Sequence, residues 1–202
     1  MNATDEELDS LASPSTRRSL EMLPAIVDVL RHRGPAGFQL TTIAEDIGTS
    51  SRMLIYHFGS RDDLLSRVMQ VVREQTVTEL SSPPPSTLVE AIDRWWAYYL
   101  DHLSDIQLFF HLASRRFEEP DRFGEFASTA IDMWRDHFAE AMRTEGYGPE
   151  YSAVVGRLVI GTLRGITADY LITGDRSHVE EALLAFRSLL QLGMREHSAP
   201  QD

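Results

Sequence analysis

The chain has 202 residues, of which 43% are hydrophobic and 25% charged, as in ordinary globular proteins that bury a core. It contains no cysteine, which excludes disulfides, thiolate metal sites and cysteine nucleophiles. Its 19 basic and 31 acidic residues give a net charge of −12, and no apolar run reaches the ~20 residues that span a bilayer. We therefore expect a cytoplasmic protein that does not enter a membrane.

Apolar residues recur every three or four positions along the chain, and no segment alternates convincingly with a period of two. Ser or Thr precedes several of these segments and Gly ends them, as at helix termini. The pattern predicts an all-α fold with about nine helices. In chain order, the helices are expected at residues 24–33, 40–47, 51–57, 62–80, 88–103, 105–117, 123–145, 150–173 and 178–196.

Prolines and short polar side chains indicate where helices begin. Pro24 has no backbone N–H to donate, so the first helix is expected to begin or kink there. Three capping boxes, each a Ser or Thr with an acidic residue three positions later, are expected at the start of later helices. They pair Ser60 with Asp63, Thr87 with Glu90, and Ser177 with Glu180.

The segment SSPPPS at residues 81–86 cannot continue a helix and marks the expected boundary between two domains. We expect a flexible tail at residues 1–14, a first domain with a connecting helix at 15–80, and a larger domain at 87–197. Residues 15–75 contain eight arginines and seven acids, a net of +1 that leaves −13 for the rest of the chain. The first domain therefore tolerates a polyanion better than the second.

Within the first domain, Ile43, Ala44, Ile47 and Gly48 have the spacing of a helix-turn-helix. The two isoleucines would anchor the first helix in the core. The small Ala44 would permit a close helix crossing, and Gly48 is free to adopt the positive φ that the turn needs.

The helix after this turn is expected to have two different faces. Leu54 and Phe58 lie one turn apart and can face the core. The side chains then directed outward are Arg52, Met53, Tyr56 and His57. The surrounding segment IGTSSRMLIYHFGSR contains no carboxylate, although the whole chain is acidic. Carboxylates on the outer face would repel phosphate, so their absence favours a helix that enters the major groove of DNA.

The sequence LTTIAEDIGTSSRMLIYHFGSRDDLL resembles the DNA-binding segment of the TetR family of transcriptional regulators, and the resemblance extends over residues 23–65. It implies a dimeric protein of nine helices that binds double-stranded DNA and a small-molecule effector. It also implies that Ser50 caps the recognition helix. The residues that it places at phosphates or base edges are Thr41, Thr42, Ser51, Arg52, Tyr56, His57 and Arg61.

Some of these residues have a second interpretation. Tyr56 would instead pack at the seam between helices, and His57 would only cap a helix or contact water. Arg17 and Arg18 would reach a minor groove from a flexible arm, although a solvated tail is the preferred interpretation.

The segment AIDRWWAYYLDHL has apolar side chains on two sides of a helix, which predicts a central helix in the larger domain. A packed core alone would account for its aromatic residues, whereas the family resemblance favours a mostly apolar ligand pocket. The candidate pocket residues are Trp95, Trp96, Tyr99, His102, Phe109, Phe110, His111, Met133, Trp134 and Phe138.

Three histidines, His102, His111 and His137, raise the question of a metal site. They do not form pairs at three- or four-residue spacing, and the sequence has no HExxH motif. We expect neither a metal nor another cofactor.

The last two expected helices resemble the pair through which TetR proteins form a two-fold four-helix bundle. Gly161 and Gly165 lie four residues apart and would let helices approach closely, although packing within one chain would also explain them. The candidate interface residues are Val154, Leu158, Gly161, Gly165, Val179, Leu183, Phe186 and Leu190.

These features together predict a ligand-responsive homodimeric transcriptional regulator, with repression the commoner mode in the family. It would bind a pseudo-palindromic operator and leave it when an apolar or amphipathic effector binds. An enzyme is not expected, because the sequence lacks a nucleophile elbow, a phosphate-binding glycine loop and metal spacing. The alternative is a dimeric small-molecule carrier or interaction protein with a vestigial helix-turn-helix.

Overall fold

The computed structural model describes residues 14–198, without the side chains of residues 14–17, 122, 124, 126, 127 and 198. Almost all of the expected N-terminal tail, and the side chain of Arg17, lie outside the described residues. No helix in the described part of the chain is both long enough and apolar enough to cross a membrane.

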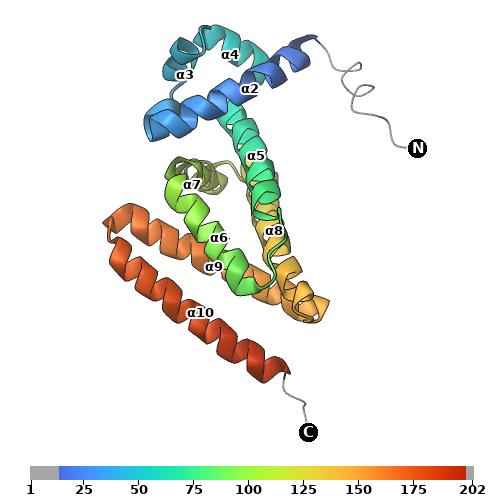
Figure 1. The fold of residues 1–202 in the computed structure, drawn as a ribbon. Coiled ribbons are helices and arrows are strands. Elements are labelled where there is room, and N and C mark those ends of the chain that lie inside the picture. The colour runs from blue at the N-terminus through green and yellow to red at the C-terminus, as the bar shows by residue number, and fades with distance from the viewer. Residues whose placement is uncertain (1–13, 199–202) are drawn as a thin grey trace, which may run out of the picture. The chain divides into compact units, whose positions relative to one another are not determined.

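The described part of the chain is helical, as the spacing of apolar residues predicts (Figure 1). Residues 14–198 contain nine α-helices and one short 3-10 helix, η1. In chain order they are α2 (Pro14–Arg33), η1 (Gly34–Phe38), α3 (Leu40–Asp46), α4 (Ser51–Phe58), α5 (Arg61–Leu80), α6 (Leu88–Asp101), α7 (Leu103–Glu118), α8 (Pro120–Thr144), α9 (Pro149–Thr173) and α10 (Arg176–Ser198).

The sequence predicted that the first helix begins or kinks at Pro24. The prediction that the helix begins there is wrong. Helix α2 begins at Pro14 and continues through Pro24. Proline costs one intrahelical hydrogen bond there. The helix nevertheless buries Leu23 and Ile26 on either side of the proline, and this burial favours a continuous helix.

Two of the three expected caps are present. The Ser60 hydroxyl accepts from the Asp63 N–H at 3.1 Å, and Thr87 accepts from the Glu90 N–H at the same distance. The third is wrong, because α10 begins at Arg176 and Asp175 caps it. The Asp175 carboxylate accepts from the His178 N–H at 3.1 Å, which an ionised side chain does better than a hydroxyl.

The chain divides into two compact units, and neither is continuous in sequence. The first unit comprises residues 1–76 and 101–126, and the second comprises 77–100 and 127–202. Helix α7 therefore belongs to the unit that contains the helix-turn-helix, whereas the limits expected from sequence assign it to the larger domain.

In the first unit, α2 contacts η1, α3, α4 and α7. Arg31 of α2 binds the buried Asp105 of α7, with Nη2 3.1 Å from Oδ2 and Nε 3.3 Å from Oδ1. This two-point ion pair joins α7 to α2, and removing either partner would leave the other charge unpaired.

In the second unit, an aromatic cluster joins α6 and α8. Trp95 lies 4.4 Å from Tyr99 and 6.2 Å from Trp134 between ring centroids, and all three are at most 3% exposed. Helix α9 approaches α8 closely at Gly156, where an added Cβ would stand 2.5 Å from the Arg135 carbonyl oxygen. Gly161 and Gly165, which are candidates for the dimer interface, have nothing within 4 Å of an added Cβ in the single chain.

Candidate nucleic-acid interface

The turn between α3 and α4 is built from local backbone bonds. Gly48 has φ +70°, a conformation that glycine adopts without strain. The Thr49 N–H donates to the Ala44 carbonyl at 2.8 Å and closes the end of α3. Ser50 is extended, and its Oγ accepts from the Met53 N–H at 3.3 Å, so it caps α4 as expected.

Helix α4 presents the two faces that its sequence predicts. Leu54 is 0% and Phe58 8% exposed, so both side chains are anchored in the core. Tyr56 is 70% exposed and Arg52 is also exposed, whereas His57 is half-buried with its ring 5.1 Å from that of Tyr56. The exposure of Tyr56 excludes its packing at a helix seam within this unit.

Two apolar side chains also lie on the outer surface of α4. Met53 is 43% and Ile55 39% exposed. Apolar contacts to thymine methyl groups are one of the ways in which a recognition helix reads bases. Because both side chains are exposed on so short a helix, we add them to the candidate DNA contacts.

Helix α3 places Thr41 at the surface and Thr42 half-buried, and Ser51 at the start of α4 is also half-buried. Asp46 at the end of α3 is neutralised by Arg33, whose Nε and Nη2 donate to its two oxygens at 2.9 and 2.8 Å. These hydrogen bonds lower the pKa of Asp46. The carboxylate at the end of α3 is therefore paired.

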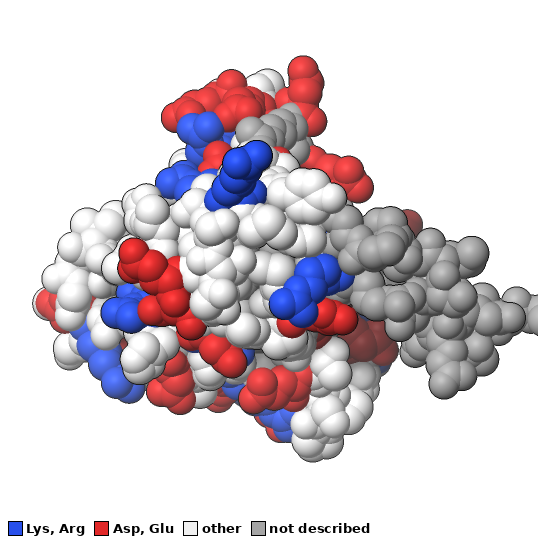
Figure 2. Space-filling view, turned by 90° about the horizontal axis from the view of Figure 1, so that it is seen from above, with Lys and Arg blue, Asp and Glu red and all other residues white. Residues whose placement is uncertain are grey.

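Arg18 belongs to α2 and not to a flexible arm. Its Nη1 lies 2.9 Å from the Glu21 carboxylate. It lines a hollow of about 290 Å³ together with Met53 and His57 of α4, so it lies at the border of the reading helix. In Figure 2 the visible arginines stand apart, among uncharged and acidic side chains of the described residues. Affinity for DNA would then depend on a few placed contacts.

Arg61, the first residue of α5, is engaged within the first unit. Its Nε and Nη2 donate to Asp62 Oδ1 at 3.1 and 3.0 Å, and Nη2 lies 3.2 Å from His111 Nε2. Because arginine only donates, His111 Nε2 must accept, which requires the neutral ring. Burial and the charge of Arg61 both lower the pKa of His111 and favour that form. Nη1 takes no part in these three contacts, so it is the part of Arg61 that would bind a phosphate.

Residues 23–68 match the family model described as bacterial regulatory proteins, tetR family. The match includes α3, the turn and α4, and the solved structures that share the fold include TetR regulators.

Residues 23–68 are therefore identified as a DNA-binding segment of the TetR family of transcriptional regulators.

Three solved structures with this fold are reported for comparison. A TetR regulator from Legionella pneumophila has a TM-score of 0.66 at 18% identity, covering 94% of this chain and 99% of that one. The fatty acid degradation regulator FadR from Bacillus halodurans has 0.59 at 14%, covering 89% and 95%. FadR from Bacillus subtilis in complex with stearoyl-CoA has 0.56 at 13%, covering 79% and 90%. No curated protein matches the chain significantly.

The TetR regulators that residues 23–68 match are transcription factors and not enzymes. In the described part of the chain, no group of three or more His, Asp or Glu side chains could hold a metal ion.

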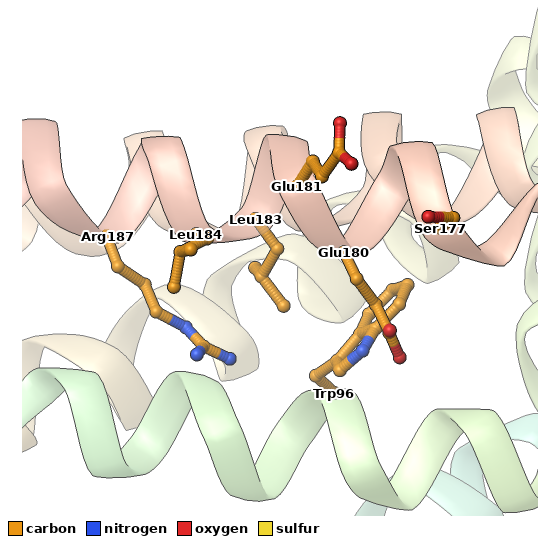
Figure 3. Close-up of a pocket in the computed structure, with 7 residues that line it drawn as sticks. All are labelled: Trp96, Ser177, Glu180, Glu181, Leu183, Leu184 and Arg187. Carbon is orange, nitrogen blue, oxygen red and sulfur yellow. The ribbon is translucent and has the colours of Figure 1, made fainter.

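The candidate pocket residues fall in both units. Those in the second unit are Trp95, Trp96, Tyr99, Met133, Trp134 and Phe138, and those in the first are His102, Phe109, Phe110 and His111. Trp95, Trp134 and Phe138 are at most 2% exposed and pack in the aromatic core. Trp96 lines a groove between α6 and α10 (Figure 3).

The candidate dimer residues also divide into two groups. On α9, Val154 and Leu158 are 68% and 54% exposed, and Gly161 and Gly165 continue the same exposed stripe. On α10, Val179, Leu183 and Leu190 are buried within the chain, and Phe186 is half-buried. Sequence reasoning missed the exposed apolar side chains of α10. Leu189 and Leu192 lie on its outward side, whereas Leu184 lines the groove with Trp96.

Proposed function

We propose that this protein is a ligand-responsive homodimeric repressor of the TetR family that reads a pseudo-palindromic operator with α4. The observation that carries the proposal is the pair of faces on α4, with Leu54 and Phe58 inward and Arg52 and Tyr56 outward. A helix anchored in this way can enter a major groove without moving its core residues.

Arg52 is the candidate for base recognition. It is exposed and stands in the first turn of α4, where a recognition helix contacts base edges. Its guanidinium can donate two hydrogen bonds to O6 and N7 of one guanine. Thr41 and Ser51, near the starts of α3 and α4, would contribute hydroxyl contacts to phosphates.

Dimerisation is proposed through the exposed apolar stripe of α9 and the outward side of α10. The two helices lie side by side within the second unit (Figure 1). A two-fold axis beside them would bury the same residues from both copies. Two reading helices would then contact half-sites ~34 to 36 Å apart, or a multiple of that distance.

The proposed effector is apolar or amphipathic. The Bacillus subtilis relative of similar fold was solved with stearoyl-CoA, an amphipathic ligand of that protein. Effector binding need contribute only ~1 to 3 kcal/mol of coupling to change the occupancy of an operator substantially.

A gel-shift titration with the DNA upstream of the gene for this protein tests the DNA-binding part. We expect binding that weakens steeply between about 50 and 200 mM salt and prefers one sequence. Arg52→Ala should lower operator affinity by about 10- to 100-fold and relax preference at one base pair. Arg195→Ala removes the same charge from the exposed end of α10 and should leave affinity unchanged.

Equal losses in both variants would show that only net charge matters. A protein that binds small molecules but retains no DNA at low salt would instead be the carrier with a vestigial helix-turn-helix.

A further inference from the structure

The guanidinium of Arg61, at the start of α5, is fixed along one edge. Its Nη2 has two hydrogens and two acceptors, which are Asp62 Oδ1 at 3.0 Å and His111 Nε2 at 3.2 Å. Its Nε also donates to Asp62 Oδ1, at 3.1 Å. One of these acceptors is the next residue in the chain, whereas the other belongs to α7.

The remaining nitrogen of Arg61 is available for a ligand. Nη1 forms no hydrogen bond with the described residues and is not buried. The side chain as a whole is 34% exposed. Only Gly59 and Ser60 separate Arg61 from the end of α4. A duplex bound to α4 would therefore bring a phosphate within reach of Nη1.

Helix α7 contacts the start of α5 at two positions that lie one turn apart. His111 accepts from Arg61, and Arg115 Nε lies 3.2 Å from Asp62 Oδ2. Asp62 is 8% exposed and has an arginine at each of its oxygens. All four residues belong to the first unit. The orientation of the Arg61 guanidinium is therefore set by α7 as well as by α5.

The His111 ring is itself held in place as an acceptor. It is half-buried, and its centroid lies 5.6 Å from that of the Phe38 ring in η1. Burial and the charge of Arg61 lower the pKa of His111, and Arg115 adds to this effect while Asp62 opposes it. The ring is therefore neutral at physiological pH, as acceptance from an arginine requires.

From this geometry we propose that His111 is a positioning residue for operator binding. By accepting from Nη2, it holds the Arg61 guanidinium with Nη1 ready for a phosphate. A side chain that is fixed before binding loses less conformational entropy when the complex forms. The inference rests on the proposed function, because it assigns to Arg61 a contact with operator DNA.

Operator titrations with variants of His111 test this role. His111→Leu removes the acceptor and should lower affinity about two- to tenfold, the cost of immobilising one long side chain on binding. His111→Phe also removes the acceptor but keeps a ring beside Phe38, so it should show the same loss. His111→Gln supplies an amide oxygen that can accept from Nη2 and should keep affinity within about twofold of the unmodified protein.

Arg61→Ala provides the matched background for a double-mutant cycle. It should lower affinity and reduce the slope of log affinity against log salt by about 0.9, as expected for one lost phosphate contact. His111→Leu should have no further effect in this background, because no guanidinium is left to position. Circular dichroism checks that each variant is folded, and His111→Phe replaces His111→Leu in the cycle if the latter is not.

Three results would overturn the positioning role. They are an equal loss from His111→Leu with and without Arg61, no loss when Arg61 is present, and a loss in His111→Gln as large as that in His111→Leu. The first result would mean that His111 acts only on the structure of the first unit.

DNA binding by the unmodified protein separates this inference from the proposed function. If the protein binds its operator and the cycle gives no coupling between His111 and Arg61, the regulator stands and the positioning role fails. The same holds if Arg61→Ala leaves operator affinity unchanged. If the unmodified protein retains no DNA at low salt, the proposed function fails and this inference fails with it.

Discussion

At the residue scale, burial determines the protonation state of one histidine in the second unit. His137 of α8 is 8% exposed, and its Nδ1 lies 3.1 Å from the Ser81 hydroxyl while Nε2 has no partner among the described residues. Burial, and to a smaller extent the charge of Arg94, lowers the pKa of His137 to about 4. The ring is therefore neutral in the folded protein at physiological pH.

This histidine makes stability depend on pH. An unfolded chain binds the proton near pH 6.5, whereas the folded chain resists it until about pH 4. The unfolded state thus holds more protons in this window, so the stabilisation is complete above pH 6.5 and is lost as pH falls. We expect a loss of ~2 kcal/mol in the free energy of unfolding between pH 7 and 4.5.

Urea denaturation at the two pH values measures this loss, and His137→Gln should remove it. His178→Gln serves as the control, because His178 is exposed and its pKa is raised by Asp175, which reverses the sign of its contribution. If His137→Gln still loses free energy of unfolding between pH 7 and 4.5, the loss belongs to the titration of another group.

At the element scale, the contact between α8 and α9 depends on one residue without a side chain. An added Cβ at Gly156 would meet the Arg135 carbonyl oxygen at 2.5 Å and the Ala139 nitrogen at 3.1 Å, both of which are backbone atoms. Neither can rotate away, so the two helices would have to separate.

We expect Gly156→Ala to destabilise the protein by ~1 to 3 kcal/mol in urea denaturation, despite the better helix propensity of alanine. Gly193→Ala is the matched change in α10, where nothing lies within 4 Å. It should stabilise the protein by ~0.5 to 1 kcal/mol. If both substitutions stabilise, α8 and α9 are not in close contact at Gly156.

At the scale of the whole molecule, the proposed dimer explains the apolar residues that the second unit leaves in water. Leu158 and Leu192 are 54% and 58% exposed on α9 and α10. An exposed apolar surface shared by two neighbouring helices is typical of a protein interface. The four-helix bundle proposed above would cover it.

We expect Leu158→Glu combined with Leu192→Glu to give a monomer in sedimentation experiments, because pairing would bury four carboxylates per dimer near the two-fold axis. Operator affinity should fall at least about tenfold, since one reading helix lacks the second half-site. Circular dichroism should stay unchanged, because both positions are already exposed. Phe117→Glu, at a 91% exposed position of α7, should leave the dimer intact. A dimer that survives the double substitution would place the interface elsewhere.

Much of this protein follows from local patterns in its sequence. The spacing of apolar residues determines that the described chain is helical, and the pattern around Gly48 determines the turn, the cap at Ser50 and the two faces of α4. These features depend on residues within about one or two helical turns of each other, so periodicity and capping chemistry are sufficient to predict them.

The tertiary structure decided what local patterns could not. Pro24 lies inside α2 because distant side chains cover that helix. Helix α10 is apolar on both its inward and outward sides, so only packing shows that Leu183 is buried while Leu184 faces water. The long-range pairs of Asp105 with Arg31 and of Asp93 with Arg187 likewise depend on which helices meet. Helix period identifies the faces of a helix, but the partner of each face is set by contacts between residues far apart in the chain.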